Sequence, residues 1–134
     1  GRQVVPLLAD RDLSRNGIEV DLFGSRARVA AGPASLALAT GAPLVVANIH
    51  YERLRGAWRQ AAGRRWGIVV EFSRMISPPP ARDNATAIAQ MTQEWVDELA
   101  QGIATHPEDW HMLQPVFVED LDPDRRVPAA NVGK

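Results

Sequence analysis

Cysteine is absent from this chain of 134 residues. Its absence excludes disulfides, a thiolate nucleophile and cysteine-based zinc sites within the sequence. Lysine is almost absent too, because fourteen of the fifteen basic residues are arginine and the single lysine is Lys134. Apolar runs are short, and none approaches the ~20 residues that a bilayer-spanning helix requires. We therefore expect any membrane contact to be peripheral.

The chain also lacks an excess of charge of either sign. Its net charge is −1, and charged residues make up 23% of the composition. A nearly neutral chain is unlike typical nucleic-acid-binding domains, so we expect no nucleic-acid partner. Hydrophobic residues make up 46%, which is enough for a packed core and argues against disorder. Arginine is nevertheless a strong phosphate partner, because its planar fork donates two parallel hydrogen bonds.

Strand and helix patterns alternate along the chain, which predicts an α/β fold. Strands are expected at residues 3–9, 18–23, 44–51 and 66–72. Helices are expected at residues 32–40 and from a cap at Asn84 to a stop at Pro107. We expect residues 1–118 to form part of one domain, with a loose tail at residues 119–134. The first expected strand is of a buried type with nothing before it to cover it, which indicates a chain entered in mid-domain.

Three stretches of sequence carry a family resemblance. They are VVPLLADRDLSRNGIEVDLFG at residues 4–24, GPASLALATGAPLVV at residues 32–46 and HPEDWHMLQPVF at residues 106–117. In order and spacing they resemble the lysophospholipid acyltransferase superfamily, in the branch shared by bacterial lipid A late acyltransferases and phosphatidylinositol mannoside acyltransferases. The first and third stretches are more similar to the mannoside enzymes.

The resemblance implies the C-terminal part of an acyltransferase-type mixed sheet flanked by helices. It implies transfer of a long acyl chain, palmitoyl, from acyl-CoA to a mannose hydroxyl of a phosphatidylinositol mannoside. Acyl-CoA is then a substrate, and no cofactor or metal is expected. The implied location is peripheral, on the anionic cytoplasmic face of the plasma membrane. The alternatives are a related enzyme with another glycolipid acceptor, or a non-catalytic lipid-binding or interaction domain.

The family's catalytic histidine motif, a histidine followed five residues later by Asp or Glu, is absent from this chain. His50, His106 and His111 all lack an acid at that place. We therefore expect the general base to lie in the N-terminal half of the enzyme, and this chain alone to be inactive. His106, followed by Pro107, is expected to form a structural corner.

Glu19 is the candidate catalytic residue. It lies in IEVDLF, where residues alternate between an apolar and a polar face. A carboxylate can orient a histidine base and stabilise its imidazolium form, and the resemblance implies that Glu19 pairs with the missing histidine. The alternative is a half-exposed polar strand face that Glu19 shares with Asp21.

Asp10, Arg11 and Asp12 are the candidate substrate-binding residues. They follow the expected strand at residues 3–9, and open α/β sheets place ligands at the carboxyl ends of strands. Arg11 could hold a phosphate or sugar oxygen while the two aspartates fix its orientation. The alternative is a local ion-paired turn.

Two further groups allow either a functional or a structural interpretation. The first, Arg53 to Arg65 with Trp58 and Trp66, has a composition suited to anionic headgroups, but a solvated hairpin would look the same. The second follows helical spacing and could line an acyl slot or simply form core: Met91, Trp95 and Leu99.

Overall fold

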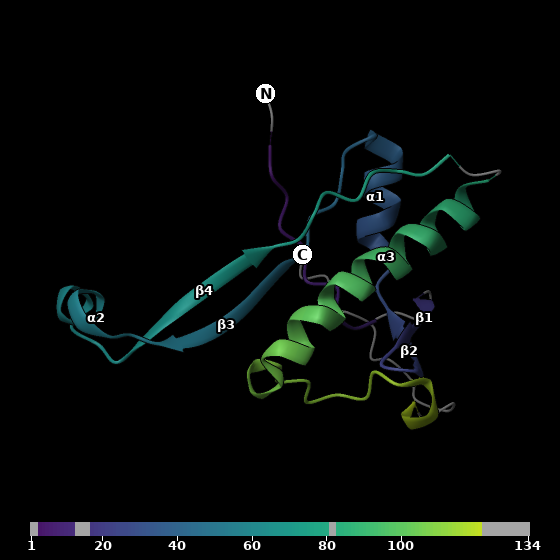
Figure 1. The fold of residues 1–134 in the computed structure, drawn as a ribbon. Helices are drawn as coiled ribbons and strands as arrows, with labels where there is room; N and C mark the ends of the chain where they lie inside the picture. The colour runs from purple at the N-terminus through teal and green to yellow at the C-terminus, as the bar shows by residue number, and fades with distance from the viewer. Residues whose placement is uncertain (1–2, 13–16, 81–82, 122–134) are drawn as a thin grey trace, which may run out of the picture.

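The computed structural model describes residues 3–12, 17–80 and 83–121 (Figure 1). The fold class is α/β, as the sequence predicted. Within the described ranges, four strands form two antiparallel pairs, joined by three α-helices and two short 3-10 helices. Of the tail expected at residues 119–134, residues 122–134 lie outside this description.

The first sheet is a tight hairpin of β1 (Ile18–Leu22) and β2 (Ser25–Val29). Its register pairs Glu19 with Arg28 and Leu22 with Ser25, leaving a two-residue turn at Phe23 and Gly24. Both turn residues have positive φ, 56° and 77°, which suits the right-handed twist of a two-residue hairpin. The sequence predicted β1 but not β2.

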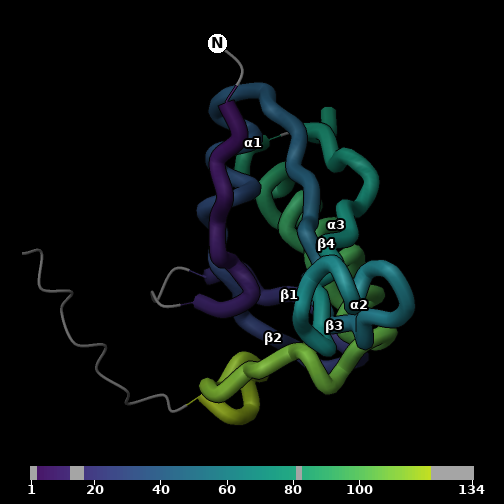
Figure 2. The backbone as a smooth tube through the Cα atoms, turned by 90° about the vertical axis from the view of Figure 1, so that its left-hand side faces the viewer, coloured from purple at the N-terminus to yellow at the C-terminus, as the bar shows by residue number. Residues whose placement is uncertain are grey.

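One face of this hairpin is apolar and covers the core. Its buried members are Val20, Leu22, Ala27 and Val29. They pack with buried residues of α1 (Gly32–Thr40) and of α3 (Asn84–Thr105). After α3 the chain passes η1 (Pro107–Asp109) and runs back along β2, where Arg28 N donates to Val116 O at 2.9 Å. It then forms η2 (Val118–Asp120) (Figure 2).

The longest helix, α3, forms where the helical repeat of apolar residues predicted it. Its cap is Asp83, one residue before the expected Asn84, and the Asp83 carboxylate accepts a hydrogen bond from Thr86 N. Met91 and Trp95 are buried on the face toward β1 and α1, so their interpretation as core is confirmed. The helix ends at Thr105, immediately before the His106–Pro107 corner.

The second sheet forms an arm that projects from the body (Figure 1). It consists of β3 (Ala47–Arg53) and β4 (Trp66–Phe72), with the short helix α2 (Gly56–Ala62) at its tip. The expected strand at residues 66–72 is confirmed. The strand expected at residues 44–51 begins three residues later, and the central position expected for it is wrong, because β3 pairs only with β4 among the described residues.

The buried strand expected at residues 3–9 is also wrong. Val4 and Leu8 are 95% and 100% exposed, and the segment joins neither sheet. The segment is attached to the body at its C-terminal end, where Ala9 O accepts a hydrogen bond from Ala30 N at 3.3 Å. An apolar composition cannot make a buried strand without a neighbouring strand to pair with, and the described residues supply none here.

Candidate functional site

Glu19 lies on the outward face of the β1–β2 hairpin, between two arginines of β2. Its Oε1 accepts a hydrogen bond from Arg28 Nη2 at 2.9 Å, and its Oε2 accepts one from Arg26 Nη2. The strand period produces this arrangement: Arg26 and Arg28 alternate with buried Ala27, so both guanidinium groups reach the face that carries Glu19. The Glu19 side chain keeps 33% of its surface exposed, which leaves room for another donor.

The turn that holds Asp10, Arg11 and Asp12 lies beside this pair. Asp12 Oδ2 accepts a hydrogen bond from Gly17 N at 2.9 Å. A Cβ added to Gly17 would overlap both the Asp12 carboxylate and Cγ of Arg28, so both side chains lie against Gly17, just before β1. The structure therefore brings the predicted substrate-binding turn to the start of β1, near Arg28, which pairs with the predicted catalytic carboxylate. Asp10 and Arg11 are half-buried in the same turn.

Asp21, which shares the polar face of β1 with Glu19, has a structural role. Its Oδ1 accepts a hydrogen bond from Gly24 N at 3.1 Å and so fixes the hairpin turn. Its backbone N–H donates to Gln93 Oε1, and its carbonyl accepts from Gln93 Nε2, both at 2.9 Å. The Gln93 amide therefore acts as a short strand on the edge of β1 and holds the hairpin against α3. Gln93 could not be predicted as this partner from the sequence, because one polar residue on a helix carries no signal of a contact 72 residues away.

Arg26 and Arg28 were also missed as members of the site. The signal that could have found them is the alternation in SRARV after the turn at Gly24, which places both arginines on one face of a second strand. Together the two guanidinium groups satisfy one carboxylate and keep further N–H donors, since each guanidinium carries five. The site can therefore hold a carboxylate in a fixed orientation and offer donors to an anionic group beside it.

A second group of polar side chains lies where α3 meets the arm. The rings of His50 and His106 stack, with centroids 3.7 Å apart and planes at 9°. Asp109 Oδ2 accepts a hydrogen bond from Tyr51 N at 2.8 Å, and Glu108 Oε1 lies 4.0 Å from His106 Nδ1. Ligand atoms of His106, Glu108 and Asp109 all lie within 4.8 Å of one another, so these are the residues that could approach a cation here. Each already has a protein partner, and the group forms the structural corner expected at His106.

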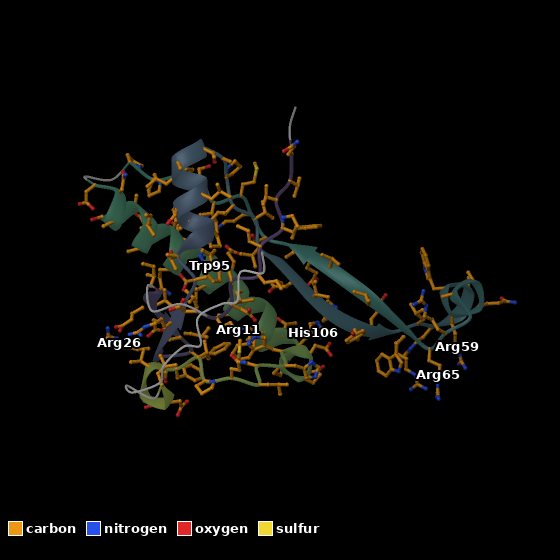
Figure 3. All side chains as sticks on the ribbon, turned by 180° about the vertical axis from the view of Figure 1, so that it is seen from behind. Arg11, Arg26, Arg59, Arg65, Trp95 and His106 are labelled. Atoms are coloured by element: carbon orange, nitrogen blue, oxygen red, sulfur yellow. The ribbon has the colours of Figure 1, made fainter. Side chains whose placement is uncertain are left out.

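The arginine-rich segment forms the tip of the arm, far from Arg11 and Arg26 on the body (Figure 3). Its exposed residues are Arg53, Arg55, Arg59, Arg64, Arg65, Trp58 and Trp66. No described carboxylate lies within ion-pairing distance of these arginines. A hollow of about 410 Å³ lies among α2 and the turn that follows it, lined in part by Arg59, Arg64 and Arg65. None of the described helices is both long enough and apolar enough to cross a bilayer.

Comparison with known proteins places these features in a family. Residues 1–119 match the model of the bacterial lipid A biosynthesis acyltransferases. The chain is 43% identical over 125 residues to the phosphatidylinositol mannoside acyltransferase of Mycobacterium tuberculosis (strain H37Rv), and 39% identical over 120 residues to that of Mycolicibacterium smegmatis. These alignments cover 92% and 90% of this chain but only 34% of either relative. The chain thus spans about a third of the length of the relatives it matches, and it belongs to the bacterial lipid A biosynthesis acyltransferase family.

Proposed function

We propose that this chain is part of an enzyme that transfers a long acyl chain, palmitoyl, from acyl-CoA to a mannose hydroxyl of a phosphatidylinositol mannoside. Its membership of an acyltransferase family and the names of its relatives support the reaction and the acceptor. One observation supports the site in particular: Arg26 and Arg28 hold the carboxylate of Glu19 near the Asp10–Asp12 turn.

In this proposal Glu19 orients a histidine that the rest of the enzyme supplies. Acyl transfer to a sugar hydroxyl needs a base to take the hydroxyl proton as the oxygen attacks the thioester carbonyl. A histidine in that role becomes an imidazolium, and a carboxylate behind it fixes the ring and stabilises the new charge. A carboxylate has about four lone-pair positions. Arg26 and Arg28 occupy part of that capacity, and the exposed side of Glu19 remains for the ring N–H.

Arg11 and its two neighbouring aspartates bind substrate in this proposal. The Arg11 guanidinium suits a phosphate of the donor or acceptor, because it can donate two parallel hydrogen bonds. The carboxylates of Asp10 and Asp12 suit sugar hydroxyls, which donate hydrogen bonds to carboxylate oxygens. Asp12 already holds the Gly17 backbone at 2.9 Å, so it also keeps the turn next to Glu19.

The test compares Glu19→Gln with Asp21→Asn in the full-length enzyme. Both changes remove a charge from the same face of β1 and keep the shape of the side chain. Exposed ion pairs contribute ~0–1 kcal/mol each, so Glu19→Gln should leave stability almost unchanged. Loss of an oriented base should lower kcat by ~10²–10⁴-fold with little change in KM, whereas Asp21→Asn should stay within a few-fold of wild type.

Full activity of Glu19→Gln would remove Glu19 from the mechanism. Binding of the mannoside without any acyl transfer by wild-type enzyme would favour the non-catalytic lipid-binding alternative. Transfer to other glycolipids in preference to the mannoside would favour the related enzyme with a different acceptor.

The tip of the arm is the proposed contact with anionic lipid, at the cytoplasmic face of the plasma membrane. Each arginine near such a surface contributes ~1 kcal/mol, or about a fivefold gain in binding. We expect Arg59→Gln and Arg64→Gln each to weaken binding to vesicles that contain phosphatidylglycerol. Arg74→Gln removes the same charge from the base of the arm, where Arg74 pairs with Glu94 and Glu98, and should have little effect. Equal binding to neutral and anionic vesicles would exclude this contact.

A further inference from the structure

The two faces of the β3–β4 arm differ in what covers them. One face packs on the body: Asn48 Nδ2 donates to Glu98 O at 3.1 Å, and His50, which is buried, stacks on His106. The register places every second residue of both strands on the opposite face. That face carries one continuous apolar patch, here named the arm strip, made of Ala47, Ile49, Tyr51, Ile68, Val70 and Phe72.

The arm strip is bare. Ile49 and Ile68 are 60% and 62% exposed, and Phe72 is 73% exposed. An antiparallel sheet with one solvated face ordinarily carries polar residues on that face. Here the solvated face is the apolar one, and a contiguous apolar patch on a protein surface marks an interaction site.

The backbone of the arm distinguishes between possible occupants. Among the described residues β4 pairs only with β3, so its other edge has no strand partner. A protein segment can satisfy that edge by adding a strand, whereas hydrocarbon cannot hydrogen-bond to it. Charge points the same way: the exposed arginines gather around α2, and the one charged residue on the face of the strip, Arg53, lies at its tip end. The membrane contact proposed for the tip therefore does not extend along the strip.

We propose that the arm strip is the docking surface for the remaining part of the full-length acyltransferase. This inference rests on the proposed function, in which the chain supplies one part of a longer enzyme. The lengths of the relatives support this inference, because about two thirds of each relative lies outside the region that aligns with this chain. Covering the strip would take five large side chains out of water, and burial of that apolar surface favours the association of the two parts.

Cysteine labelling can test this, because the 134-residue chain has no cysteine of its own. Ile68→Cys and Phe72→Cys place a thiol on the arm strip, and Gln60→Cys places a matched one on exposed α2. Each variant is made in the full-length enzyme and in the 134-residue chain. Maleimide modification is followed by mass spectrometry of the peptide that carries the new cysteine. In the full-length enzyme without lipid we expect the two strip thiols to react at least tenfold more slowly than in the 134-residue chain, with Gln60→Cys unchanged.

Other outcomes would overturn the inference. Equal labelling in both proteins would mean that the strip stays bare. Protection only after addition of phosphatidylcholine–phosphatidylglycerol vesicles would assign the strip to the membrane, and protection of the 134-residue chain that rises with its concentration would assign it to a second copy. Hydrogen exchange of the β4 amides in unmodified protein gives an independent measurement, and equal exchange in both proteins would count against docking.

The outcome is separable from that of the proposed function. An accessible strip in an enzyme that acylates the mannoside would refute the docking surface alone. A protected strip in a full-length protein without acyltransferase activity would refute the proposed function alone.

Discussion

Met91 is the residue whose truncation should most directly test the described core. Its side chain is fully buried on α3, among residues of β1, β2 and α1. Burying a methionine side chain contributes ~1.5–3 kcal/mol through transfer from water alone. Met91→Ala also leaves a cavity that the neighbours fill only in part, so the expected loss is ~2–5 kcal/mol.

Met75→Ala is the matched control. Met75 is 69% exposed, so Met75→Ala removes the same atoms from a side chain outside the core. Substitutions at such surface positions usually stay within ~0.5 kcal/mol of wild type. Since a whole domain is stabilised by only ~5–15 kcal/mol, the two variants should differ clearly.

The measurement is urea unfolding of the 134-residue chain, followed by tryptophan fluorescence, with Trp95 four residues from Met91 on the same helix. We expect the midpoint of Met91→Ala to fall well below those of wild type and Met75→Ala, with similar m-values. A Met91→Ala midpoint equal to that of Met75→Ala would refute the packing of α3 on β1 and α1.

Two further predictions concern the ends of α3. Gly102→Ala should destabilise the fold by ~1–3 kcal/mol, because the new Cβ would overlap the Asn48 amide. Alanine normally stabilises a helix relative to glycine, so the expected effect has the opposite sign. Thermal unfolding measures it, with Gly32→Ala as the control, because a Cβ at Gly32 meets open space. Hydrogen bonds from Thr86 N–H and hydroxyl lower the pKa of Asp83 below its ordinary 3.8, so its carboxylate stabilises the fold above that pH and less as pH falls through the folded-state pKa. The Tm deficit of Asp83→Ala should therefore be largest near neutral pH and shrink in acid, and a deficit that is constant with pH would contradict the cap.

Elements with a strong local signal could be predicted from the sequence. The helix α1 has the expected bounds because Pro33 suits a first turn and Gly41 adopts the left-handed conformation, with φ of 69°, that ends it. The strand β4 has the expected bounds, and α3 follows the helical spacing of its apolar residues. Local signals were less reliable at the end of β1. The strand was expected to run to Phe23, but Phe23 has a positive φ and forms the hairpin turn with Gly24.

The candidate site was predicted only in part. Glu19 was expected on the polar face of a strand and Asp12 in a turn, and both lie there. The sequence could not show that Arg28 pairs with Glu19 and lies, like Asp12, against Gly17, since that depends on how β2 folds back on β1. Whether Glu19 acts in catalysis stays a prediction for the full-length enzyme.

The sequence by itself determined the family, the helical and strand periods and the chemical types of the candidate residues, because each depends on neighbours a few positions apart. Tertiary structure decided which residues meet: Gln93 with β1, His50 with His106, and Arg28 with Glu19. It also decided that the apolar residues 4–8 and the arm strip lie bare. Composition records that a segment favours burial, but burial itself requires a partner surface, and only the arrangement in space shows whether the partner is there.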